Sequence, residues 1–358
     1  MTIRLMQGDL LKQDDVDAIV NTVNCVGVMG KGIALQFRNK WPANNQAYEL
    51  ACKAGQLKLG QMFVFDSGGL MKPNFIINFP TKGHWRAKSE LKSIRDGLKD
   101  LVAQVRHLKI KSIAIPPLGC GNGGLEWSDV RPLIVDAFEQ LRDVEVRLFD
   151  PIGAPAAKAM EVRTPQPKMT PGRAAILKVL DTYRALGYGL SRIEVQKLAY
   201  FLQEAGQGLK LNFVPHEYGP YSDQLRHVLN RMEGHYIRGV GDGVVDAEIE
   251  PMPTALAEAD AFLANDDDGP DLIQRVAKVE QLIDGFQSPY GMELLATVYW
   301  VSQHEPFAQN HSEALQAVRG WNERKRQLMQ PAHVEIAWNR LADEGWISAS
   351  TQKVAASN

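Results

Sequence analysis

Short runs of apolar residues, or of alternating apolar and polar residues, recur along the first 150 positions of the chain. They are typical of β-strands and predict six of them, at 2–8, 18–23, 63–67, 75–79, 112–115 and 144–149. Apolar residues instead recur every three or four positions over 88–108 and over about 127–141, which predicts two amphipathic helices. Strands that alternate with helices are typical of an α/β fold in which helices cover both faces of a sheet.

The second half of the chain has mainly helical periods, at 172–187, 190–206, 292–303 and 333–346. Ser191 and Glu194 have the spacing of a capping box at the start of the second of these helices. A stretch with five prolines and no sustained apolar period, 151–172, separates the halves. We therefore predict a first domain at 1–155, a linker at 156–172 and a mainly α-helical second domain at 173–358.

Composition limits the classes of protein that the chain can belong to. Its 358 residues are enough for about two domains. No apolar run approaches the ~18 residues of a membrane span, so we expect a cytoplasmic protein without a membrane partner. The three cysteines lack metal-ligand spacing, and we expect no metal site. Residues 1–150 hold 20 Lys and Arg against 16 Asp and Glu, whereas 151–358 hold 20 against 26, so the first half is basic and the second acidic.

The loops that follow the predicted strands are the places to look for a site, because open α/β sheets bind ligands at the carboxyl ends of their strands. Gly8 and Asp9 follow the first strand. The carboxylate of Asp9 either caps a turn or accepts a hydrogen bond from an exocyclic amine of a ligand. The sequence leaves both readings open.

Two of these loops are rich in glycine. The segment NTVNCVGVMGKGIALQF, 21–37, leads through three glycines into a helix, whose first N–H groups and positive dipole end attract anions. The segment PPLGCGNGGLEW, 116–127, has four glycines that can form a nest of N–H groups. Neither matches the dinucleotide fingerprint or the P-loop. Two such loops at one sheet edge predict a diphosphate site.

Taken together, GDL at 8–10, the segment 21–37, NFPTKGHWR at 78–86 and the segment 116–127 resemble a macrodomain, the ADP-ribose-binding fold, over nearly all of residues 1–150. The resemblance implies a three-layer α/β domain with a mixed central sheet of about six strands. It is strongest to the branch that removes ADP-ribose through a lysine, and within it to the DNA-directed glycohydrolases that serve as antitoxins.

The resemblance also implies the residues of the site. Lys82 would be catalytic, Asp9 and Leu10 would hold the adenine, and Asn24 would lie near the distal ribose. The implied ADP-ribose-binding residues are Gly8, Asp9, Leu10, Thr22, Asn24, Gly30, Lys31, Gly32, Ile33, Ala34, Thr81, Leu118, Gly119, Cys120, Gly121, Asn122 and Gly123. ADP-ribose would be the ligand and product, and no separate cofactor is expected.

A lysine suits cleavage at C1 of a ribose in two ways. An unprotonated amine can attack that carbon, and a protonated amine can stabilise the departing group. Attack requires a pKa below the usual ~10.4, through burial or a neighbouring cation such as His84 or Arg86. The plain alternative for Lys82 is an exposed loop lysine.

Gly123 marks a departure from part of the family. Protein-directed relatives in the lysine branch have an aspartate at the matching position, which acts as an acid–base partner. Its absence here disfavours hydrolysis of ADP-ribosyl-glutamate and fits a thymine base in single-stranded DNA as the modified group. A reader module that binds ADP-ribose without turnover is a further alternative, and Lys82 discriminates between the reader and the hydrolase.

The basic first half would attract the phosphates of such a DNA substrate. The candidate DNA contacts are Lys31, Arg86, Lys88 and Lys92. The alternative for each of them is a solvated surface charge.

In the second half, QKLAYFLQEAG at 196–206 and HEYGPYSDQL at 216–225 resemble the Panacea-type domain of antitoxins. Residues 239–274 hold ten acids and no Lys or Arg, and we predict an acidic insertion there. It is either a solvated, partly disordered segment or a phosphate mimic that occupies the DNA groove of a cognate toxin of the DarT type, a DNA ADP-ribosyltransferase. The candidate toxin-binding residues are Asp242, Asp246, Glu248, Glu250, Asp266, Asp267 and Asp268.

Overall fold

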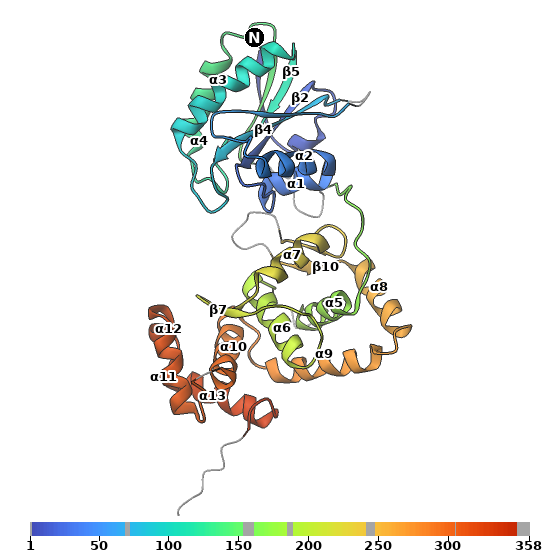
Figure 1. Cartoon of the computed structure of the whole chain (residues 1–358), viewed down its shortest axis with the longest axis vertical. Helices are drawn as coiled ribbons and strands as arrows, with labels where there is room; N and C mark the ends of the chain where they lie inside the picture. The colour runs from blue at the N-terminus through green and yellow to red at the C-terminus, as the bar shows by residue number, and fades with distance from the viewer. Residues whose placement is uncertain are drawn as a thin grey trace, which may run out of the picture. The chain divides into compact units, whose positions relative to one another are not determined.

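The computed structural model describes residues 2–68, 72–152, 161–184, 189–240, 248–304 and 306–348. The chain forms two compact units, and the border between them along the chain falls between Gln166 and Pro167 (Figure 1). Each unit has its own apolar core. Among the described residues, no helix is long and apolar enough to span a membrane.

The first unit is built on a six-stranded sheet. Its strands are β1 (Thr2–Met6), β2 (Ala18–Asn24), β3 (Phe63–Asp66), β4 (Phe75–Lys82), β5 (Ser112–Ile115) and β6 (Glu145–Phe149). They lie in the order β1-β6-β5-β2-β4-β3, with every neighbouring pair parallel except β3 and β4. The sheet is therefore mixed, as the resemblance implies, and each predicted strand is present.

Helices cover both faces of this sheet, which confirms the three-layer α/β fold (Figure 1). The helices of the first unit are α1 (Gly32–Lys40), α2 (Pro42–Lys53), α3 (Leu91–His107) and α4 (Trp127–Phe138), with a short 3₁₀ turn, η1, at Leu10–Lys12. Successive residues of a strand point to opposite faces. Val20 accordingly packs in the core that includes α3 and α4, whereas Ile19 packs with Phe37 of α1.

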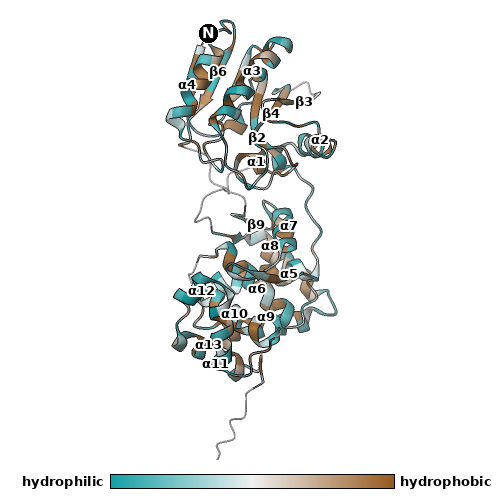
Figure 2. Cartoon of the chain, turned by 60° about the vertical axis from the view of Figure 1, so that its left-hand side comes forward, coloured by the Kyte–Doolittle hydropathy of each residue, from teal (hydrophilic) through white to brown (hydrophobic). Residues whose placement is uncertain are grey.

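The second unit is mainly helical, as predicted. Its elements are α5 (Pro171–Arg184), α6 (Arg192–Glu204), β7 (Val214–His216), β8 (Gly219–Tyr221), α7 (Asp223–Met232), β9 (Ile237–Arg238), β10 (Glu250–Pro251), α8 (Pro253–Ala264), α9 (Gly269–Ile283), α10 (Pro289–Gln303), α11 (His311–Trp321), α12 (Glu323–Leu328) and α13 (Pro331–Asp343). Apolar residues gather in its interior, in α6 and α10 above all (Figure 2). The capping box of Ser191 and Glu194 is present. Helix α5 begins at Pro171, so the last two residues of the predicted linker are helical.

The acidic stretch differs from the insertion predicted at 239–274. Its longer described part, 248–274, contains α8 and the start of α9, and Ala255, Ala259 and Leu263 belong to the core of the unit. Apolar residues at helical spacing make this part integral to the fold, and most of its acids are exposed. Asp242 and Asp246 lie outside the described residues.

Candidate active site

Four segments predicted to form the site leave the sheet at one edge. The strands β1, β6, β5, β2 and β4 are mutually parallel, so their carboxyl ends lie together. Asp9 follows β1, the first glycine loop follows β2, the second follows β5, and Lys82 ends β4. Asn24 and Lys82 are register partners on adjacent strands, and the N–H of Cys25 donates to the carbonyl of Gly83 at 3.1 Å.

The first glycine loop ends at the N-terminus of α1. Gly32 opens this helix with a φ of +56°, a left-handed conformation that glycine adopts without strain. The N-cap residue Lys31 makes no side-chain capping bond to the first turn. The first N–H groups of this nine-residue helix, at Gly32, Ile33 and Ala34, therefore receive no cap from Lys31, and they lie at the positive end of the helix, where an anion is stabilised.

The second glycine loop is closely packed against the start of α3. A Cβ atom on Gly123 would lie 2.3 Å from both the carbonyl oxygen of Gly119 and Oγ of Ser89. The N–H of Ser89 donates to the carbonyl of Gly123 at 3.0 Å, and that of Leu125 donates to Gly119 at 3.1 Å. No side chain fits at position 123 without a shift of the backbone, which is a physical reason for the absence of a carboxylate there.

Lys82 reaches from β4 to this second loop. Its Nζ donates to the carbonyl oxygen of Asn122 at 3.0 Å. The side-chain Nδ2 of Asn122 in turn lies 3.0 Å from the position that a Cβ on Gly32 would take. Asn122 thus contacts the lysine on one side and faces the start of α1 on the other, so that both glycine loops and the amine meet at one place.

The half-buried position of Lys82 changes its acidity. Burial penalises the charged ammonium form and lowers the pKa of Lys82 below its ordinary value. Burial is the cause of this shift, and the sequence neighbours His84 and Arg86 are exposed. A lower pKa favours the unprotonated amine that attack at a carbon centre requires.

Three predicted ligand residues have partners within the protein. Nδ2 of Asn24 donates to the carbonyl of Val28 at 2.7 Å, and Oδ1 accepts from the N–H of Val26 at 3.0 Å, so this side chain shapes the first glycine loop. The hydroxyl of Thr81 is buried and donates to the carbonyl of Val23 at 3.4 Å. The carboxylate of Asp9 caps η1 through Leu11, which is one of the two readings of this residue.

The remaining predicted residues differ in exposure. Leu10 and Leu118 are buried in the core, Gly121 and Asn122 are exposed, and Gly123 is buried. Direct contact of any of these residues with ADP-ribose stays a prediction.

A row of buried amides under the site was not expected from the sequence. Nδ2 of Asn21 on β2 donates to Oδ1 of Asn78 on β4 at 2.9 Å, and Nδ2 of Asn78 donates to Oδ1 of Asn44 on α2 at 2.7 Å. Tyr48 of α2 donates its buried hydroxyl to the carbonyl of Asn24 at 2.7 Å. These bonds tie both strand ends to α2 and fix the positions of Asn24 and Lys82. The sequence signal was an asparagine within each apolar strand run, AIVNTV and FIINF.

The predicted DNA contacts Lys31, Arg86, Lys88 and Lys92 are all exposed. Arg86 and Lys88 lie in the segment 83–90 between Lys82 and α3, and Lys92 lies in the first turn of α3. DNA contact stays a prediction for all four.

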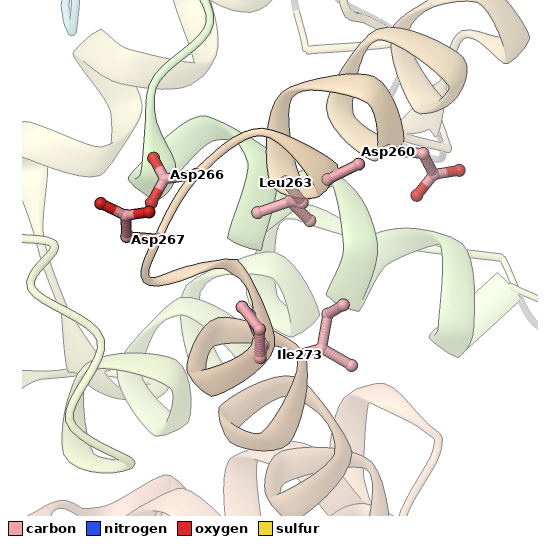
Figure 3. A pocket seen from close by; sticks show the side chains of 7 residues that line it. Asp260, Leu263, Asp266, Asp267 and Ile273 are labelled. Atoms are coloured by element: carbon pink, nitrogen blue, oxygen red, sulfur yellow. The ribbon is translucent and has the colours of Figure 1, made fainter.

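The predicted toxin-binding acids of the second unit are partly paired. Oε1 of Glu250 lies 3.3 Å from a guanidinium nitrogen of Arg184, and Oδ2 of Asp268 lies 2.9 Å from one of Arg275. Asp266 and Asp267 instead border a hollow of about 500 Å³ between α8 and α9, with Leu263 and Ile273 on its apolar floor (Figure 3). Glu248 is exposed next to β10. Binding of a toxin by these residues is untested.

A mixed sheet covered by helices on both faces, with two glycine loops at its carboxyl edge, defines a macrodomain, and the Macro domain family model matches residues 20–134. The DNA ADP-ribosyl glycohydrolase of Thermus aquaticus is 46% identical over 343 residues, which cover 96% of this chain and 94% of that protein. The chain therefore belongs to the family of DNA ADP-ribosyl glycohydrolases.

Two further matches cover parts of the chain. The solved macrodomain of Mycobacterium tuberculosis DarG is 56% identical, with a TM-score of 0.41, and the match covers 42% of this chain and 98% of that one. A DNA ADP-ribosyl transferase–DNA ADP-ribosyl glycohydrolase fusion protein of Thermosipho africanus is 32% identical over 184 residues, 47% of this chain and 45% of that protein.

Proposed function

We propose that the first unit hydrolyses the N-glycosidic bond between ADP-ribose and thymidine in single-stranded DNA, with Lys82 as the catalytic group. The observation that carries this proposal is the bond from Nζ of Lys82 to the carbonyl of Asn122, because it places a half-buried amine between two glycine loops suited to a diphosphate. The name of the relative that is 46% identical supports the reaction class.

The chemistry follows from the position of the amine. The Asn122 carbonyl accepts one N–H of Lys82, which leaves the lone pair of a neutral amine directed elsewhere. Attack on C1 of the distal ribose breaks the bond to the base, and the base leaves with the electron pair and takes up a proton. Water then cleaves the ribose–lysine adduct and releases ADP-ribose and the free lysine. A protonated Lys82 would instead stabilise the departing base while water attacks C1, and the base takes up the proton that this water loses, so no adduct forms.

The test compares Lys82→Ala with the wild-type protein on ADP-ribosylated single-stranded DNA. We expect the variant to lose turnover by a factor of about 10³ while its affinity for free ADP-ribose, measured by calorimetry, stays within a few-fold of wild type. Equal release by both proteins would refute Lys82 as the catalytic group, and release by neither would leave a reader of ADP-ribose.

The same assay ranks the substrates. The packing of Gly123 against Ser89 leaves no place for a carboxylate at that position, so we expect modified DNA to be cleaved faster than ADP-ribosyl-glutamate on protein. The reverse order would favour a protein ADP-ribosyl hydrolase.

For the second unit we propose an antitoxin role, in which it binds and blocks a DarT-type DNA ADP-ribosyltransferase in the cytoplasm. A relative that joins the transferase and the glycohydrolase in one chain supports the pairing of the two activities. The carboxylates of half-buried Asp266 and exposed Asp267 beside an apolar hollow fit the basic groove that a DNA-modifying enzyme presents.

A further inference from the structure

The segment that follows Lys82 carries three side chains that contact one another and that the proposed chemistry does not use. The ring centroids of His84 and Trp85 are 5.3 Å apart with an interplanar angle of 30°. The guanidinium carbon of Arg86 lies 4.5 Å from the centroid of the Trp85 ring. His84 and Arg86 are exposed and Trp85 is half-buried, so this cluster lies at the surface of the unit.

Hydrogen bonds hold this segment to both loops of the site. At its start, the carbonyl of Gly83 accepts from Cys25 of the first glycine loop at 3.1 Å, and at its end Ser89 donates to Gly123 of the second at 3.0 Å. Within the segment, the N–H of Ala87 donates to the carbonyl of His84 at 2.9 Å. The N–H of Arg86 donates to the ring nitrogen Nδ1 of His84 at 3.2 Å. The backbone that carries these three side chains is thus tied to the site.

We propose that His84, Trp85 and Arg86 form a stacking platform for a nucleobase of the DNA strand that carries the ADP-ribose. The proposal rests on the function proposed above. The group bonded to C1 of the distal ribose is a base, and the platform begins two residues beyond the amine that reaches this carbon. Two to four residues of chain span at most about 7–14 Å, the size of a nucleotide.

The side chains of the platform suit an unpaired base. Aromatic rings and arginine guanidinium planes stack on bases, and each stacked base contributes roughly 1–3 kcal/mol. The exposed cations Lys88 and Lys92 follow directly in the chain and supply charge for the phosphates on either side of that base. A bound oligonucleotide would therefore find a π surface and positive charge on one continuous segment.

The test measures the affinity of the full-length protein for an ADP-ribosylated oligothymidine and for free ADP-ribose. Trp85→Ala and Trp85→Leu should each raise the Kd for the oligonucleotide about tenfold, whereas Trp85→Phe, which keeps an aromatic face, should retain most of the affinity. The Kd for free ADP-ribose should stay at the wild-type value in all three variants. ADP-ribosylated thymidine, tested as a single nucleoside, distinguishes stacking of the modified base from stacking of its neighbour.

Matched substitutions control for charge and for damage to the fold. Arg86→Ala should reduce the salt dependence of oligonucleotide binding, whereas Arg106→Ala, an exposed arginine in the last turn of α3, should not. The platform would be overturned if Trp85→Ala bound the oligonucleotide with unchanged affinity, or if the leucine and phenylalanine variants bound it equally well. A parallel loss of affinity for free ADP-ribose would also overturn it. If the wild-type protein bound the modified strand without cleaving it, the proposed hydrolase would be refuted. The measured Kd values would still decide whether the platform exists.

Discussion

Gly123 lies where the carbonyl of Gly119 and the hydroxyl of Ser89 leave no room for a side chain. The carbonyl of the neighbouring Asn122 accepts a hydrogen bond from Lys82 and orients it. A methyl group at position 123 would shift the loop and so move this carbonyl and the amine bonded to it. We expect Gly123→Ala to reduce kcat on modified DNA by on the order of a hundredfold, the effect of a displacement of about 1 Å at a reacting group.

Gly83→Ala is the matched control for this substitution. Gly83 flanks Lys82 as Gly123 flanks Asn122, but a Cβ there would meet no atom within 4 Å and its φ is not left-handed. Initial rates and thermal unfolding of both variants check the prediction. It would be contradicted by equal rates in the two variants, or by a loss of rate in Gly123→Ala explained by global unfolding.

A buried cluster of charges joins three helices of the second unit. Lys197 of α6 is buried and donates to the carbonyl of Pro220 at 2.6 Å, while Lys325 of α12 donates to Glu293 of α10 at 2.5 Å. Burial, together with the charge of Lys325, lowers the pKa of Lys197 to about 7. The unfolded chain keeps this proton up to a pKa of about 10.4, so between these values it binds more protons than the folded state, and stability rises with pH.

Lys197→Met removes the titrating group, and we expect the variant to lose this pH dependence. Its advantage over wild type in free energy of unfolding should be largest near pH 6. That advantage should shrink as the pH rises to 9, by at most about 1.4 kcal/mol per pH unit. Urea unfolding at three pH values measures the difference. Lys278→Met, at an exposed position of α9, should keep the wild-type slope, and a Lys197→Met slope equal to that of wild type would refute the assignment.

The local pattern of apolar and polar residues predicted most helices and strands and missed those that depend on partners distant in sequence. Strands and long amphipathic helices follow from periodicity, which each segment carries by itself. Helix α2 was missed because its buried face holds Asn44, Asn45 and Tyr48, whose polar groups face other buried polar groups. In the site, Lys82 and the glycine loops were predicted, whereas Asn78 and Ser89 acquire their roles only through contacts with Asn21 and Gly123, far away in sequence.

The two units of the molecule have separate cores, and their different charge balances suit different partners. A proline-rich stretch and a change in periodicity fall between the halves of the sequence, and the border between the units lies within that stretch. The acidic stretch was harder to interpret, since acids at the outward positions of α8 and α9 resemble a solvated loop when only composition is read. Their partial pairing with Arg184 and Arg275 leaves Asp266 and Asp267, beside the hollow, as the better candidates for contact with a basic partner.

If the second unit blocks the transferase, binding should separate from hydrolysis when the chain is divided at the border between its units. We expect residues 167–358, which contain a complete apolar core, to retain the toxin in a pull-down at low salt, and residues 1–166 to retain none of it. In the full chain, Asp266→Asn with Asp267→Asn should weaken retention about tenfold, because two carboxylates that face a basic groove are lost. Glu280→Gln with Asp284→Asn makes the same change in charge on the exposed end of α9 and should bind as wild type. Retention by the first unit alone, or equal retention by both double variants, would refute the role of this surface.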